Sequence, residues 1–98
     1  MNTRISLPSS EPPQSITEVI TALKTKKLRP KHEKKDWGDW ISFADKETVI
    51  SIESIRGLAT SATVESAENE WDFLQKILQI FATLGWQGED EDGPYPLY

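Results

Sequence analysis

The segment from Ser66 to Trp86 constrains the fold most, because its apolar residues recur at helical spacing and make one broad face. These residues form two adjacent stripes, Trp71, Leu74, Leu78 and Phe81 on one and Phe73, Ile77, Ile80 and Leu84 on the other. Ser66 is the predicted N-cap, and Gly85 predicts a Schellman C-terminus in which Trp86 folds back on Phe81. A helix with so wide an apolar face is typical of one that packs on a sheet.

A second, shorter helix is predicted from Ser15 to about Leu28. Ser15 and Glu18 have the spacing of a capping box, and Pro30 ends the helix. The apolar residues of this segment recur at a period of 3.6: Ile16, Val19, Ile20 and Leu23.

Alternating apolar and polar residues predict strands at 40–44 and 49–55, joined by a loop at 45–48, and a weaker third strand at 58–65. The connections are too short for parallel crossovers, so the strands should form an antiparallel meander. Alternation predicts which side chains face the helices: Ile41, Phe43, Ile50, Ile52, Leu58, Ala62 and Val64. The opposite face should carry small or polar residues, Ala59 among them, with Trp40 as its one large aromatic residue.

The sequence therefore predicts a single small α+β domain of order α-β-β-β-α, with a three-stranded antiparallel meander and both helices packed on one face. Residues 1–14 are predicted to be a disordered N-terminal lead, and residues 15–86 the α+β domain. Residues 87–98 are predicted to be an acidic, Pro/Tyr-rich C-terminal tail.

The chain has no cysteine, which excludes disulfides, thiolate metal sites and cysteine nucleophiles. No apolar run approaches the ~20 residues that a membrane-spanning helix needs. The first fifteen residues contain no apolar core of a signal peptide. A cytoplasmic protein without membrane association is the expectation.

Charge is distributed unevenly along the chain. Residues 1–35 carry eight Lys or Arg and three Asp or Glu, a net charge of +5, whereas residues 36–98 carry three and thirteen, a net charge of −10. The two values agree with the overall charge of −5. We expect the two parts to neutralise each other, with the acidic tail brought near the lysines.

The basic run from Lys24 to Lys35 suggests two interpretations. It is either an exposed connector between a helix and a strand, which we favour, or a nucleic-acid-binding segment with adjacent stacking aromatics. The residues of the second interpretation are Lys24, Lys26, Lys27, Arg29, Lys31, Lys34, Lys35 and Trp37.

No catalytic or metal-binding constellation is found, and neither an enzyme nor a cofactor is expected. His32, the only histidine, lacks an evident set of partner residues in the sequence. The acidic stretch 88–93 resembles a calcium loop only faintly, because its first position is glycine and the chain ends before the last position.

The favoured function is a non-catalytic protein-interaction or regulatory module, of the inhibitor, immunity or adaptor type, that uses an acidic surface and exposed aromatics. The protein partner is unknown, and a homodimer is an alternative. The predicted partner-binding residues are Trp40, Glu68, Asp72, Glu89, Asp90, Glu91, Asp92, Tyr95 and Tyr98. The tyrosine-containing tail is expected either to cover Trp40 or to be offered to another protein.

Overall fold

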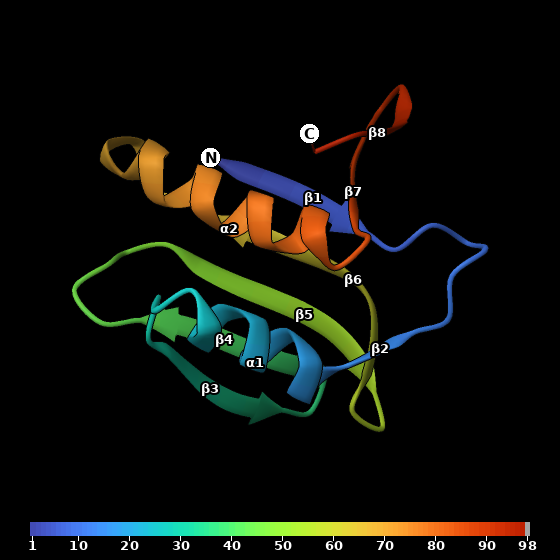
Figure 1. The fold of residues 1–98 in the computed structure, drawn as a ribbon, viewed down its shortest axis with the longest axis horizontal. Coiled ribbons are helices and arrows are strands. Elements are labelled where there is room, and N and C mark those ends of the chain that lie inside the picture. Colours follow the sequence, from blue (N-terminus) through green and yellow to red (C-terminus); the bar gives the residue numbers. More distant parts are fainter. Residues whose placement is uncertain (98) are drawn as a thin grey trace.

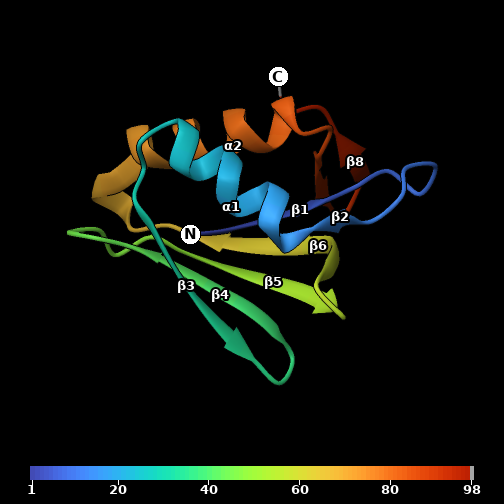
Figure 2. The same cartoon turned by 60° about the horizontal axis from the view of Figure 1, so that its bottom comes forward.

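A single antiparallel sheet with two helices on one of its faces makes up the computed structural model, which describes residues 1–97 (Figure 1). The strands are β1 (Asn2–Ser6), β2 (Gln14–Ser15), β3 (Pro30–Lys35), β4 (Gly38–Phe43), β5 (Val49–Ile55), β6 (Leu58–Glu65), β7 (Gln87–Asp90) and β8 (Gly93–Tyr95). The helices are α1 (Ile16–Thr25), the 3₁₀ turn η1 (Glu68–Glu70) and α2 (Trp71–Thr83). The strand order is β3-β4-β5-β6-β1-β7-β8, and β2 pairs separately with β6. Figure 2 shows both helices above the sheet, with the β3–β4 hairpin extending downward, away from them.

The α+β class and the antiparallel pairing are confirmed, but the sheet has eight strands rather than the three of the predicted meander. The predicted strands correspond to β4, β5 and β6. The additional strands extend the sheet on both sides of this meander.

The predicted disordered lead differs from the structure, because residues 2–6 form β1 beside β6. Ile5 pairs with Ala62 and is fully buried, so this segment contributes to the core. The N-terminal ammonium of Met1 donates to the Ser66 carbonyl at 3.0 Å, and the Ser66 amide donates back to the Met1 carbonyl at 2.8 Å. The predicted tail likewise contains β7, which pairs with β1, and β8. Tyr98 lies outside the described residues.

Strand β3 contains the centre of the basic run and forms one edge of the sheet. Its register with β4 pairs Pro30 with Phe43 and Lys35 with Gly38. Five of its six residues are exposed, so no apolar alternation marks it as a strand in the sequence. Lysines on an edge strand oppose pairing with other chains.

Helix α1 begins as predicted, because the Ser15 hydroxyl accepts a hydrogen bond from the Glu18 amide at 3.1 Å. It ends at Thr25, three residues before the predicted boundary. The Leu28 amide donates to the Leu23 carbonyl at 3.2 Å, and Lys27 has a left-handed φ of 62°. These features define a Schellman motif with lysine at the position that glycine usually occupies.

Helix α2 confirms the predicted end but not the predicted beginning. The Trp86 amide donates to the Phe81 carbonyl at 2.9 Å, Gly85 has a φ of 94°, and the Phe81 and Trp86 rings pack edge to face at 5.0 Å. Ser66 is not the N-cap, because the 3₁₀ turn η1 intervenes and the Ser66 hydroxyl bonds to the Met1 carbonyl instead. The Trp86 indole donates to Gln14, which ties the end of α2 to β2.

The core lies between the helices and the sheet, and six of the seven predicted inward residues are buried in it. The seventh, Leu58, is 48% exposed, whereas Ala59, predicted to face outward, is fully buried. The pairing of β5 with β6 shifts between Glu53 and Ser54, which leaves Thr60 as an extra residue in β6. This β-bulge reverses the alternation at the start of β6 and turns Leu58 outward.

Candidate functional site

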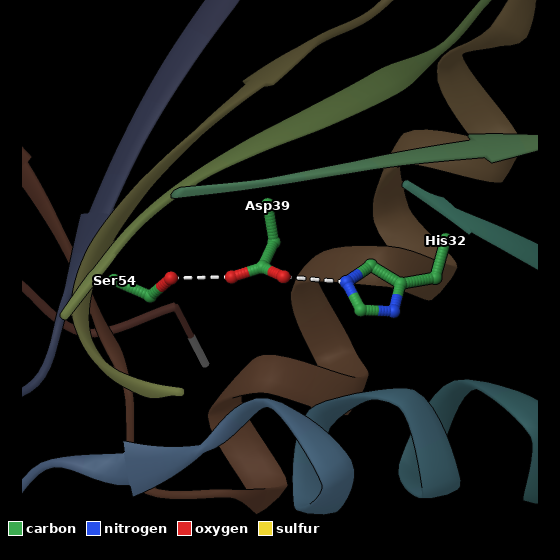
Figure 3. Close-up of polar contacts among 3 residues, drawn as sticks. All are labelled: His32, Asp39 and Ser54. Carbon is green, nitrogen blue, oxygen red and sulfur yellow. Dashed lines mark hydrogen bonds and ion pairs between the residues drawn. The ribbon is translucent and has the colours of Figure 1, made fainter. Parts of the chain in front are cut away.

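A chain of polar contacts crosses three strands close to the β3–β4 turn (Figure 3). The Ser54 hydroxyl on β5 donates to one carboxylate oxygen of Asp39 on β4. The other oxygen lies 2.5 Å from Nε2 of His32 on β3. Asp39 is only 4% exposed, whereas the His32 side chain is 35% exposed. Each oxygen of the nearly buried Asp39 carboxylate thus has one hydrogen-bonding neighbour, on β3 for one oxygen and on β5 for the other.

The register of the sheet explains why these three residues meet. His32 pairs with Ile41, and Asp39 pairs with Ile52, so both polar residues lie on the face that carries the helices. Gly38, with a φ of 152°, allows β4 to approach β5 closely, because a Cβ atom there would lie 2.0 Å from the Ile52 carbonyl oxygen. The glycine therefore positions Asp39 for its contact with β5.

The order of the groups in this series of polar contacts decides its chemistry. In a Ser-His-Asp triad the imidazole lies between the hydroxyl and the carboxylate, so that it can accept the hydroxyl proton. Here the carboxylate of Asp39 is in the middle, and Ser54 has no imidazole base. The contacts link three strands rather than activating a nucleophile. Across residues 1–97, no group of three or more His, Asp or Glu is arranged to hold a metal ion.

An apolar hollow lies at the same end of the sheet, and its lining includes residues of both the β3–β4 and the β5–β6 turns. Its volume is about 930 Å³. Its main apolar residues come from the two turns and from the segment before β2: Pro13, Trp37, Ile55 and Leu58. Glu53, Ser54, Arg56 and Thr60 complete the lining.

The hollow is connected to the polar chain through Ser54, which belongs to both. Ile55 and Leu58 are opposite each other across the β5–β6 turn, whose central residues Arg56 and Gly57 have φ values of 55° and 77°. Positive φ at both positions is typical of a type I′ turn, which matches the twist of a tight hairpin. Ile55 and Leu58 are thus held by a tight hairpin rather than by a long loop.

The structure does not bring the predicted partner-binding residues together. Trp40 is half-buried on β4, and Tyr95 packs on Gly88 at the opposite edge of the sheet. Glu68 and Asp72 lie at the beginning of α2, whereas Glu89–Asp92 follow its end. A 13-residue helix is about 20 Å long, so these carboxylates form two separate groups. They do not make one acidic surface.

The basic run is also divided. Lys24, Lys26 and Lys27 lie at the end of α1, whereas the alternation of β3 places Lys31 and Lys35 on one side of the sheet and Lys34 on the other. Arg29 lies between the two groups with a φ of 57°, and Trp37 lies in the turn after β3. The run therefore presents its charges in several directions.

The expected neutralisation of the lysines by the acidic tail is wrong. Strands β3 and β7 are five steps apart in the sheet, which corresponds to about 24 Å at the usual strand spacing. The only lysine ion pair among residues 1–97 is Lys35 with Glu33, at 3.2 Å. The described strands of the tail, β7 and β8, also do not cover Trp40, because they lie beyond β1.

Sequence reasoning missed Ile55, Leu58 and Pro13 as components of a surface site. Leu58 was assigned to the core by alternation, and no sequence pattern announces the bulge at Thr60. The available signal was the tetrapeptide Ile55–Leu58, in which two large apolar residues flank a tight turn. Turn-flanking residues pair side by side, so two apolar ones make a patch if they face outward.

Glu70 is the carboxylate whose pKa is lowered in the folded protein. The main cause is the Thr48 hydroxyl, which donates to Glu70 at 2.6 Å, and the amides of Glu47 and Thr48 add to the effect. Burial acts in the opposite direction and Lys46 in the same one, but the hydrogen bonds dominate. The carboxylate thus anchors the β4–β5 loop to the beginning of α2.

Comparisons with protein-family models, with curated proteins and with solved structures gave no match. Neither α1 nor α2, nor any other helix within residues 1–97, has the length and apolar character needed to span a membrane.

Proposed function

We propose that this chain is a protein-binding module whose docking surface is the apolar hollow at the β3–β4 and β5–β6 turns. The observation that carries the proposal is the exposure of Trp37, Ile55 and Leu58, which are 50%, 78% and 48% exposed. Residues 1–97 contain six exposed large apolar side chains, and three of them line this one hollow. Apolar residues scattered singly need no explanation, but their convergence marks an interaction site.

The composition of the hollow suits an apolar anchor from a partner protein. Tryptophan is enriched among the residues that contribute most to binding, and such residues cluster in pockets that become fully desolvated. Arg56 lies on the lining beside the apolar residues, where it can pair with polar groups around an anchor, whereas Glu53 on the same lining is already paired with Arg4 at 3.6 Å. The hollow therefore replaces the acidic surface as the proposed interaction site.

The rigid connection of the hollow to the sheet supports binding with little reorganisation. Most of its residues lie on the end of β5 and the beginning of β6, and the His32–Asp39–Ser54 contacts join β5 to β4 and β3 beside it. A preformed surface loses less conformational entropy on association than a flexible loop does.

Binding of nucleic acid is the second candidate function. The separation of the lysines from the acidic β7–β8 segment favours it, because the basic run is left without that counter-charge. Five phosphate contacts would give a log–log salt dependence of about −4 on duplex DNA. A gel-shift series across salt concentrations, repeated with Lys31→Ala/Lys35→Ala, measures this slope; absence of binding at low salt excludes the function.

The proposed function is tested by capture of partners from the source cell, followed by titration of the purified partner. Trp37→Ser and Ile55→Ser should each weaken binding by about 30-fold, the equivalent of about 2 kcal/mol for a central interface residue. Trp71→Ser is the matched control, because Trp71 is 56% exposed at the beginning of α2 and does not line the hollow.

Light scattering completes the test by measuring whether the chain associates with itself. A dimer that dissociates in Trp37→Ser but not in Trp71→Ser identifies a second copy of the chain as the partner. Equal affinities of wild type, Trp37→Ser and Ile55→Ser for every captured protein would refute the hollow as the docking surface.

A further inference from the structure

We propose that a groove between the end of α1 and the middle of α2 binds a phosphate ester whose organic part is apolar. The groove has a volume of about 480 Å³. Its lining comes from both helices: Lys26, Lys27, Leu28, Lys76, Gln79, Ile80 and Thr83. It is separate from the apolar hollow, with which it shares no residue.

Three lysine residues line this groove, and none of them has a counter-charge among residues 1–97. Lys26 and Lys27 follow α1, and Lys76 comes from α2, about fifty residues later in the chain. None of these three side chains forms an ion pair with another residue in the described part of the chain, not even Lys76 with Asp72 one turn away. Like charges that lie close together repel, so an anion between them is favourable.

The floor of the groove is apolar. Leu28 is half-buried, and Ile80 is only 6% exposed and belongs to the core. A free anion leaves such a floor in contact with water, whereas a ligand with an apolar body covers it. The positive charge of the lysines and the apolar floor of the groove together favour an anion that carries an apolar group.

The backbone at Lys27 provides a second observation. Its φ of 62° lies in the left-handed region, where glycine is the favoured residue. Lysine is strained there relative to glycine, as Arg29, Asp45 and Arg56 are at similar φ values, but Lys27 is the one of the four that lines the groove. Glycine would end α1 equally well but would remove one of the three charges.

A phosphate monoester matches the site better than a carboxylate does. It carries close to two negative charges and three acceptor oxygens, so each of the three ammonium groups can have its own oxygen. Gln79 and Thr83 supply polar groups at the rim on the α2 side.

The test is a titration of the full chain with inorganic phosphate and with phenyl phosphate at low ionic strength. Binding is monitored by the changes in amide NMR chemical shifts. Phenyl phosphate should bind at least about fourfold more tightly, the equivalent of burying one methylene group. Lys76→Ala and Lys27→Gly should each weaken binding about fivefold, the equivalent of one charge–charge contact in water. Lys24→Ala is the matched control, because Lys24 lies on the same helix end but does not line the groove.

Vesicles containing phosphatidic acid identify the source of the phosphate. Phenyl phosphate binding without vesicle binding supports a soluble ester, and vesicle binding that requires Lys27 and Lys76 supports a lipid headgroup. Equal affinity for inorganic and phenyl phosphate, or an equal loss in Lys24→Ala, overturns the proposal. The proposal is also overturned if neither phosphate binds and a single-stranded oligonucleotide binds through Lys31 and Lys35.

Discussion

Removal of the His32 imidazole tests whether the His32–Asp39–Ser54 contacts stabilise the fold. Asp39 is 4% exposed, so His32→Ala leaves a nearly buried carboxylate with Ser54 as its remaining partner. Removing one hydrogen-bond partner of a buried, charged acceptor costs about 3 kcal/mol or more. His32 is about one-third exposed, and water can enter when its ring is removed, so we expect the lower limit of about 3 kcal/mol.

The double variant His32→Ala/Asp39→Asn separates loss of a contact from isolation of a charge. A neutral amide at position 39 can still accept from Ser54 and carries no charge that needs a partner. The double variant should therefore be destabilised by only about 1 kcal/mol, less than His32→Ala alone. For a domain of this size 3 kcal/mol corresponds to a fall in melting temperature of about 12 °C or more.

Urea unfolding and thermal scans at pH 7, monitored by tryptophan fluorescence, measure these differences in the free energy of unfolding and in melting temperature. Lys34→Ala is the control, because Lys34 pairs with Asp39 across β3 and β4 but forms no ion pair with it. Its effect should stay within about 0.5 kcal/mol, as for other exposed residues. A double variant less stable than His32→Ala would refute the idea that the cost arises from an unpaired carboxylate.

Three further predictions concern the backbone and one carboxylate. Gly38→Ala should destabilise the fold by at least about 3 kcal/mol in urea unfolding, because its Cβ would overlap the Ile52 carbonyl. Gly93→Ala is the control: its φ of 106° is also positive but its Cβ would meet open space, so it should cost only about 1 kcal/mol. Lys27→Gly should raise stability by about 1 kcal/mol in the same assay by relieving its left-handed conformation, and a loss would contradict this account of the end of α1. Glu70 has a folded-state pKa below its ordinary value of 4.5, so its contribution to stability is present above pH 4.5 and is lost as the pH falls through the lower folded value. Glu70→Gln should therefore be less stable than wild type at pH 7 and approach it in acid, whereas Glu68→Gln should match wild type throughout.

The parts of the fold that sequence could predict are those encoded by local chemistry. The spacing of Ser15 and Glu18, and of Phe81, Gly85 and Trp86, fixes backbone hydrogen bonds within a few residues. Such patterns favour the same local hydrogen bonds in many folds, whereas the predicted N-cap at Ser66 is replaced by a contact with the distant Met1 carbonyl. The meander of β4, β5 and β6 belongs to the same class, because its connections are short.

The outer strands could not be predicted in this way, because β1 and β7 pair with segments distant in the sequence, and β3 lacks apolar alternation although its partner β4 is adjacent. Strand β1 is stabilised by pairing with β6, some sixty residues later in the chain. Strand β3 has the composition of a solvated segment and becomes a strand because β4 offers it a free edge. Prolines and lysines indicate loops in isolation, but on sheet edges they protect against association.

The candidate sites escaped prediction for the same reason. His32, Asp39 and Ser54 come together only when three strands adopt their register, and their spacing in sequence indicates nothing. The hollow depends on the extra residue Thr60, which turns Leu58 outward beside Ile55. One local irregularity thus creates a surface that a regular alternation would have hidden in the core.

The two proposed sites are far enough apart to act independently. Helix α1 begins directly after Ser15, which pairs with Leu58 at the hollow, and it ends next to Lys26 in the groove. Ten helical residues span about 15 Å, and the two linings have no residue in common. Sites at this distance that share no partners contribute additively unless binding at one changes the conformation at the other. Trp37→Ser should therefore leave the affinity for phenyl phosphate unchanged, and Lys27→Gly should leave the affinity for the protein partner unchanged. A change of more than about twofold in either cross-measurement would mean that α1 transmits a conformational difference between the groove and the hollow.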